Sequence, residues 1–180
     1  MHRVIELVQN DPLRLEALAC ANQLQLPDHY LAAGFVRNMV WDHLHHKASP
    51  TPLNDVDLIY FNRHETQPTR YLYYEAKLRE AMPQLNWQVR NQALMHQRNG
   101  DQPYLSSLDA MRYWPEQETA VAIRQVASGQ FECASAFGFD ALFALTVTHN
   151  PKRAKAIFEQ RIKHKQWLKQ WPNLTILIES

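Results

Sequence analysis

Two carboxylates separated by one residue are the clearest candidate for chemistry in this sequence. Asp55 and Asp57 open a run of β-branched and aromatic residues, 55–61, that predicts a β-strand. Side chains at positions i and i+2 of a strand point to the same face, so the two carboxylates should lie together. A hard divalent cation, Mg²⁺ or Mn²⁺, would offset their repulsion and could bridge the phosphate oxygens of a nucleotide. The alternative is a strand that starts at a solvated edge with two exposed aspartates.

A glycine turn precedes this pair along the chain. Residues 30–33 are apolar and lead to Gly34, after which apolar residues recur at helical spacing, so strand, turn and helix are expected in that order. A glycine lets a phosphate approach the backbone, and a helix N-terminus offers free N–H groups and a positive dipole end. Arg37 supplies either a charge-assisted bond to a phosphate oxygen or an ion pair with a surface acid. Asn38 completes the candidate phosphate cradle.

The elements that position these residues follow from apolar spacing and turn chemistry. Asp11 with Pro12, and Asn150 with Pro151, are cap-and-proline pairs that predict helix starts, and Pro172 ends the last helix. Helices are expected over residues 2–9, 11–24, 35–44, 67–82 and 150–172, with a short one from residue 106. Strands are expected over residues 30–33, 55–61, 85–91, 119–123 and 175–178. This is a mixed α/β chain of the α+β class, with strands too few and irregular for a doubly wound sheet.

Size and composition bound the organisation of the chain. Its 180 residues suit one domain, expected as N-terminal helices (1–27), a core (28–149) and a C-terminal helix with a tail (150–180). Hydrophobic residues make up 46%, enough for a packed core, and the net charge of +1 gives no global signal for a nucleic-acid or membrane partner. The two cysteines form no metal or redox motif, and neither a signal peptide nor a membrane span is visible, so a cytoplasmic protein is expected.

Two polar residues after the third expected strand are further candidates for ligand binding. Asn91 could bond the edge of a base or a sugar hydroxyl, and His96 a phosphate. Equally, Asn91 caps a helix and His96 is a half-buried side chain. Residues 84–99 contain no aspartate or glutamate.

Histidines and lysines elsewhere offer weaker signals. Asp42 and His46 are four residues apart and, with His43 and His45, form either a helical metal site or a group of solvated side chains. The last expected helix is basic and either grips an RNA backbone or exposes a solvated face while its apolar residues dock on the core. Its basic residues are Lys152, Arg153, Lys155, Arg161, Lys163, Lys165 and Lys169.

The segment that holds the turn and the carboxylates resembles a known superfamily. Leu31-Ala32-Ala33-Gly34-Phe35-Val36-Arg37-Asn38, followed by Asn54-Asp55-Val56-Asp57-Leu58, is similar to the head of the polymerase-β-type nucleotidyltransferases. The nearest motifs are the Gly-Gly-x-Val-Arg-Asp and Asp-x-Asp of tRNA CCA-adding enzymes and poly(A) polymerases. Ala33 stands in place of the first glycine, and Asn38 in place of the aspartate. Over roughly residues 30–172 the chain resembles a small stand-alone bacterial nucleotidyltransferase-like family.

The resemblance implies a polymerase-β-like core with flanking helices and a metal-dependent transfer of a nucleoside monophosphate from an NTP. It assigns catalysis and Mg²⁺ or Mn²⁺ binding to Asp55 and Asp57, and the acceptor is RNA, a protein or a small molecule. It assigns nucleotide binding to Gly34, Arg37, Asn38, Asn91 and His96. The alternatives are a nucleotide- or RNA-binding module without turnover, and a protein-partner domain of the toxin–antitoxin type in which the aspartates are structural.

Overall fold

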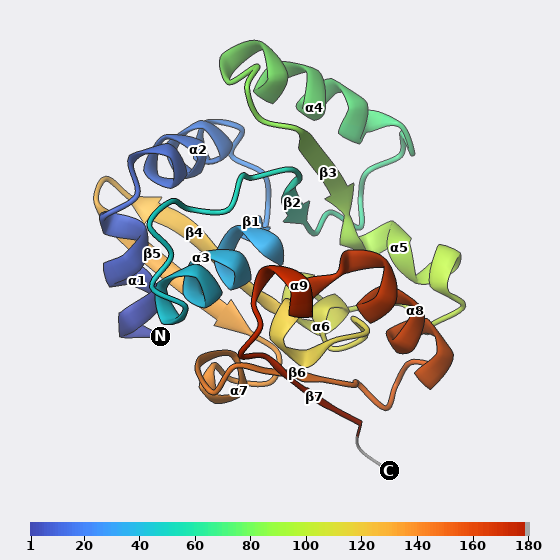
Figure 1. Cartoon of the computed structure of the whole chain (residues 1–180). Helices are drawn as coiled ribbons and strands as arrows, with labels where there is room; N and C mark the ends of the chain where they lie inside the picture. Colours follow the sequence, from blue (N-terminus) through green and yellow to red (C-terminus); the bar gives the residue numbers. More distant parts are fainter. Residues whose placement is uncertain (179–180) are drawn as a thin grey trace.

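The centre of the computed structural model, which describes residues 1–178, is a five-stranded mixed sheet (Figure 1). Its strands are β1 (Tyr30–Ala32), β2 (Val56–Tyr60), β3 (Trp87–Asn91), β4 (Val121–Ala127) and β5 (Gln130–Ser135). They lie in the order β3-β2-β1-β4-β5, with β2 and β3 parallel and each other neighbouring pair antiparallel. A sheet with a single parallel pair confirms the expected mixed α+β class.

The helices arise largely where apolar spacing predicts them. They are α1 (His2–Gln9), α2 (Pro12–Gln23), α3 (Gly34–Leu44), α4 (Arg70–Ala81), α5 (Gln92–Asn99), α6 (Ser107–Met111), the 3₁₀ helix η1 (Gln117–Thr119), α7 (Asp140–Phe143), α8 (Lys155–Lys165) and α9 (Trp167–Gln170). The Asp11 side chain caps α2 by accepting a hydrogen bond from the Arg14 N–H, as its position before Pro12 predicts. β6 (Thr146–Thr148) and β7 (Thr175–Leu177) pair in parallel as a separate sheet.

One face of the five-stranded sheet, the packed face, is apolar. Val56, Leu58 and Tyr60 of β2 point to it and are fully buried. They share a core with buried residues of α1, α2, α3 and α4, including Val4, Leu18, Phe35, Val40 and Leu78. Removing this much apolar surface from water is the main driving force for the fold.

The other face, the open face, is covered only in part. Ala32, Ile59 and Ala122 pack there in a smaller buried cluster with Met111 of α6. Beyond that cluster the side chains become polar, because Asp57 precedes Ile59 by two residues and therefore points to the same face. The alternation along β2 thus divides one strand between a core and a polar surface.

The C-terminal arm, defined as α8, α9 and Trp171, returns to α3 (red beside light blue in Figure 1). Trp167 and Trp171 meet the ring of Trp41 edge-on, with centroids 5.8 and 5.1 Å away. The Trp171 indole N–H donates to the Asp42 carboxylate at 2.8 Å. These contacts fix the arm against the middle of α3. Among the described residues, no helix combines the length and the apolar character needed to span a bilayer.

Three predictions about the later part of the chain were wrong in detail. Asn150 does not start a helix, because its side chain donates to the carbonyls of Arg112 and Trp114 and α8 begins only at Lys155. The last helix is also broken, since Gln166 adopts a left-handed conformation with φ 50°. The strand expected over 119–123 starts at Val121, and its hairpin partner β5 was missed, although residues 130–133 alternate between polar and apolar.

Candidate functional site

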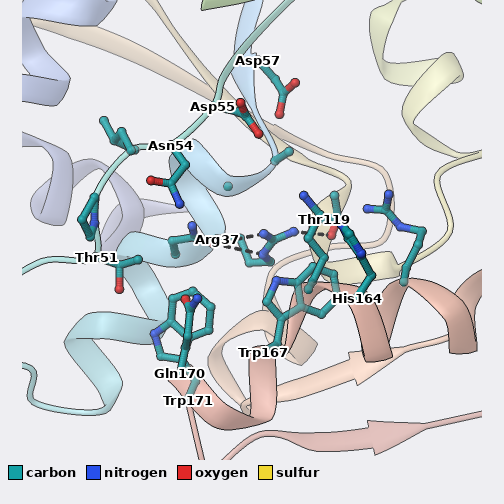
Figure 2. A pocket seen from close by; sticks show the side chains of 17 residues that line it. Arg37, Thr51, Asn54, Asp55, Asp57, Thr119, His164, Trp167, Gln170 and Trp171 are labelled. Carbon is teal, nitrogen blue, oxygen red and sulfur yellow. Dashed lines mark hydrogen bonds between the residues drawn. The ribbon is translucent and has the colours of Figure 1, made fainter. Parts of the chain in front are cut away.

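The two aspartates lie together at the mouth of a pocket (Figure 2). Asp55 directly precedes β2 and is exposed, whereas Asp57 lies within the strand and is half-buried. Val56 between them is fully buried in the packed face, so both carboxylates are turned to the other side. The Asn86 side-chain amide donates to Asp55 at 2.7 Å. Within the described part of the chain, neither aspartate forms a salt bridge.

The electrostatics of the pair favour a cation. Burial, and then the neighbouring charge of Asp55, raise the pKa of the Asp57 carboxyl above its ordinary value, while Arg37 and Lys165 act in the opposite direction. A carboxylate that resists ionisation because a like charge stands beside it gains most from a positive ion placed between the two.

The glycine turn is brought to the carboxylates by the register of the sheet. Ala32, the last residue of β1, lies opposite Asp57 of β2, so the chain turns into α3 beside that carboxylate. Ala33 makes the turn with φ 56° and ψ −122°, a conformation that glycine adopts much more readily. A Cβ atom on Gly34 would lie 3.3 Å from the Asn38 side-chain nitrogen, so the absence of a side chain keeps the helix start open. The Ala33 carbonyl accepts from the N–H groups of Val36 and Arg37, whereas the N–H groups of Gly34 and Phe35 make no hydrogen bond within the described residues.

Arg37 is a buried cation at this pocket, and only 6% of it is exposed. Its guanidinium lies 5.0 Å from the Trp41 ring and 4.5 Å from the Trp167 ring. It donates to the Thr119 hydroxyl at 2.6 Å and to the Asn38 side-chain oxygen Oδ1 at 3.0 Å (Figure 2). Burial lowers its pKa to about 10. No described carboxylate lies within salt-bridge distance, so the ion pair with a surface acid does not form.

The pocket has two compartments that meet at the carboxylates. The inner pocket, about 240 Å³, lies between the start of α3, the loop before β2 and the C-terminal arm. The outer hollow, about 740 Å³, extends toward β3 and α5. Both are lined by Ala33, Asp55, Asp57, Thr119, Arg161 and Lys165. His164 and Trp167 of the arm close the inner pocket on the side opposite the aspartates (Figure 2).

Five of the predicted site residues therefore come together. Gly34, Arg37, Asn38, Asp55 and Asp57 all line the inner pocket. Asn91 and His96 do not line either compartment, because Asn91 points to the opposite face of β3. There its side chain accepts from the N–H groups of Ala93 and Asn62 and acts as the cap of α5.

The position next to Asp57 on β3 is occupied by Gln88 rather than by Asn91. The parallel register pairs Asp57 with Gln88, and both line the outer hollow. The Gln88 side-chain oxygen accepts from Arg90 at 3.0 Å, and Arg90 is in turn paired with Glu75 at 2.7 Å. Asn91 lies three positions after Gln88 on β3, an odd number, so its side chain points to the opposite face and does not stand beside Asp57.

The histidines near His43 and the basic residues near the C-terminus divide between structural contacts and the pocket. Within the described residues, no group of three or more histidines, cysteines and acids is placed to hold a metal, so the helical site near His43 is not formed. His45 is used structurally, since its Nε2 accepts from the Asn173 N–H at 3.1 Å. Of the basic residues near the C-terminus, Arg153 pairs with Asp101 and Arg161 with Glu116. Lys165 lines both compartments.

Sequence reasoning did not connect Glu116, Thr119 and Trp167 with the site. They lie far from the aspartates along the chain, and no local motif marks them. The available signal was the four-residue spacing of Arg161 and Lys165, which places both on one side of a helix.

Comparison with known proteins agrees with this geometry. A family model described as a nucleotidyltransferase matches residues 19–176. A solved structure, described as an NMR structure that reveals a CCA-adding enzyme head domain, superposes with a TM-score of 0.87 at 31% identity. The match covers 99% of this chain and 96% of that one. No curated protein matches the sequence.

Proposed function

Because this chain belongs to a nucleotidyltransferase family, we propose that it transfers a nucleoside monophosphate from an NTP to an acceptor hydroxyl, with Mg²⁺ or Mn²⁺. The observation that carries the proposal is the combination of charges in the inner pocket. Among residues 1–178, Asp55 and Asp57 form no salt bridge, and they line the same pocket as the buried Arg37, which also has no acid within salt-bridge distance. A metal ion with a polyphosphate supplies the two charges that would satisfy both sides.

The donor set suits a hard cation that shares its ligands with the substrate. Asp55 and Asp57 would hold the ion, which would offset the charge on the phosphate oxygens when it is bound. Mg²⁺ is commonly held by one or two carboxylates together with waters and substrate phosphates, so a third acid is not required for binding. We therefore expect weak binding of the metal alone and tighter binding in the presence of an NTP.

The remaining residues of the inner pocket would receive the triphosphate. The N–H groups of Gly34 and Phe35 at the start of α3 and the guanidinium of Arg37 would supply the donors for its oxygens. The Thr119 and Asn38 bonds occupy three of the five guanidinium N–H groups, which leaves donors for phosphate oxygens. Since Trp41 and Trp167 fix the guanidinium, little ordering is needed when the ligand arrives.

The transfer forms one bond and breaks another at the α-phosphorus. The acceptor oxygen bonds to phosphorus, the bond from the α-phosphorus to the bridging oxygen breaks, and pyrophosphate leaves with that electron pair. The hydroxyl proton would pass to a carboxylate of the aspartate pair. The acceptor would enter through the outer hollow, where Arg90 and Arg98 favour an acceptor that carries negative charge.

A second candidate function, nucleotide binding without turnover, is favoured by one observation. Gln88 rather than an acid stands beside Asp57, so the chain offers fewer charged oxygens for a second metal ion. The two candidates agree on nucleotide binding and differ only in the release of pyrophosphate.

Titration calorimetry with each of the four NTPs tests the proposal. We expect at least one NTP to bind more tightly with Mg²⁺ than with a chelator, and Mg²⁺ to bind more tightly with that NTP, because the two effects are reciprocal. An Asp55→Ala variant should lose this coupling. Equal affinity with Mg²⁺ and with chelator would remove the metal role. Pyrophosphate release in the presence of candidate acceptors then separates the enzyme from the binding module.

A further inference from the structure

We propose that Glu116 is a positioning residue that holds Arg161 of the C-terminal arm in place to bind the terminal phosphates of the triphosphate. The inference rests on the proposed function and assigns to α8 a part of the site that lies outside the motifs of the turn and of β2. It starts from an ion pair whose two members have very different surroundings.

Glu116 is completely buried, with 0% of its surface exposed. Its two carboxylate oxygens accept from Arg161 Nε and Nη2, at 2.5 and 3.2 Å. The Arg161 side chain, in contrast, is 35% exposed and lines both the inner pocket and the outer hollow. A buried carboxylate is costly unless it is paired, so Glu116 strongly constrains where this guanidinium can stand.

The guanidinium of Arg161, although paired with Glu116, retains N–H groups that can bind a ligand. The bonds to Glu116 use Nε and Nη2, and Nη1 makes no hydrogen bond within the described residues. A guanidinium fixed along one edge and free along the other is suited to phosphate oxygens, which it can bind with two parallel bonds. Lys165, one turn later on α8, lines the same two compartments and adds a second positive charge.

A single short segment fixes both arginines of the inner pocket. Glu116 holds Arg161, and Thr119, three residues later, accepts from Arg37. Between them Glu118 is buried and accepts from the Thr148 N–H at 2.7 Å and from the Thr148 hydroxyl at 2.7 Å, which anchors the segment to β6. The segment 116–119 therefore sets the relation between a cation on α3 and a cation on the arm.

This arrangement favours the terminal phosphates as the ligand of Arg161. The carboxylate pair marks where the metal and the reacting phosphate would lie, and Arg37 stands beside the start of α3. Arg161 comes from α8 and Arg37 from α3, so a triphosphate in the inner pocket would meet a guanidinium from each of these helices. The terminal phosphates carry most of the negative charge of an NTP and become the leaving pyrophosphate, where added positive charge is most useful.

The test compares affinities for the NTP and for inorganic tripolyphosphate, both with Mg²⁺. Glu116→Gln keeps an oxygen for Arg161 but removes the charge that orients it, and we expect both affinities to fall by about tenfold. The melting temperature and the tryptophan emission should stay unchanged, since the arm remains docked through Trp167 and Trp171. Asp101→Asn is the matched control, because it weakens the similarly buried pair with Arg153, which lines neither compartment, and should leave both affinities unchanged.

A second pair of variants keeps the test decisive if Arg161 is also needed for stability. Arg161→Gln alone leaves Glu116 buried without a partner, whereas the double variant with Glu116→Gln removes both charges and should recover stability. The double variant should retain the full loss of triphosphate affinity. Affinities within twofold of the unmodified protein, or a loss that appears only together with a red shift in tryptophan emission, would overturn the positioning role. No NTP binding by the unmodified protein would instead overturn the proposed function.

Discussion

The two faces of the five-stranded sheet use the same strands in different ways. On the packed face every position of β2 that points inward, Val56, Leu58 and Tyr60, is fully buried beneath helices. On the open face Ile59 is buried, but Asp57 borders a cleft that the C-terminal arm closes only from the far side. The packed face therefore supplies most of the buried apolar surface that stabilises the fold, whereas the open face carries the charged groups of the pocket.

The strongest test of this comparison exchanges an apolar residue on each face. Leu58→Ala should lower the free energy of unfolding by roughly 2 to 5 kcal/mol, because the surrounding core cannot collapse onto the cavity. Ile59→Ala should cost less, since its side chain borders the outer hollow and water can replace part of it. Urea denaturation measures both values. Equal losses would contradict the distinction between the two faces.

A substitution at Asp57, next to Leu58 on β2, should weaken ligand binding without lowering the stability of the free protein. Asp57→Asn removes one of two repelling carboxylates, so the affinity for Mg²⁺-NTP should fall at least about tenfold while the free protein keeps or gains stability. Calorimetry and thermal melting measure the two effects. A marked drop in the melting temperature of the free protein would show that Asp57 makes structural bonds instead.

The same variant makes a signed prediction for pH. The pKa of Asp57 is raised in the folded protein above its ordinary value of 3.8, so the folded state holds this proton more tightly than the unfolded chain. The contribution of Asp57 to the free energy of unfolding therefore falls as pH rises from about 3.8 through the raised pKa. Above the raised pKa, Asp57 is ionised in both states and this loss of stability is complete. The gain in melting temperature from Asp57→Asn should be larger at neutral pH than near pH 4.

The smallest effect is expected at the turn between the two faces. Ala33 holds φ 56°, and glycine adopts this conformation without the steric cost of a Cβ atom. Ala33→Gly should therefore stabilise the protein by about 1 kcal/mol, despite the greater freedom that glycine has in the unfolded chain. Thermal melting checks the sign. Ala33→Val, in contrast, should destabilise, and a loss of stability with glycine would show that the alanine methyl packs productively.

The sequence made the first half of the site predictable. Period-two alternation placed Asp55 and Asp57 together, and the glycine after an apolar strand located the start of α3. The segment 116–119 and the arm were not predictable, because residues so far apart are joined only by tertiary packing. Asn91 does not reach the pocket because it lies three positions after Gln88 on β3, and an odd number of positions moves a side chain to the other face of a strand.

The inner pocket also depends on the order in which the chain is made. Its walls come from residues as distant as Ala33 and Trp171, and the strands and α3 leave the ribosome well before the C-terminal arm. A nascent chain would therefore fold its packed face first, while Trp41 and Arg37 still await their partners. A nucleotide bound in the inner pocket, as proposed above, would therefore meet a complete site only after the C-terminal arm has docked on α3.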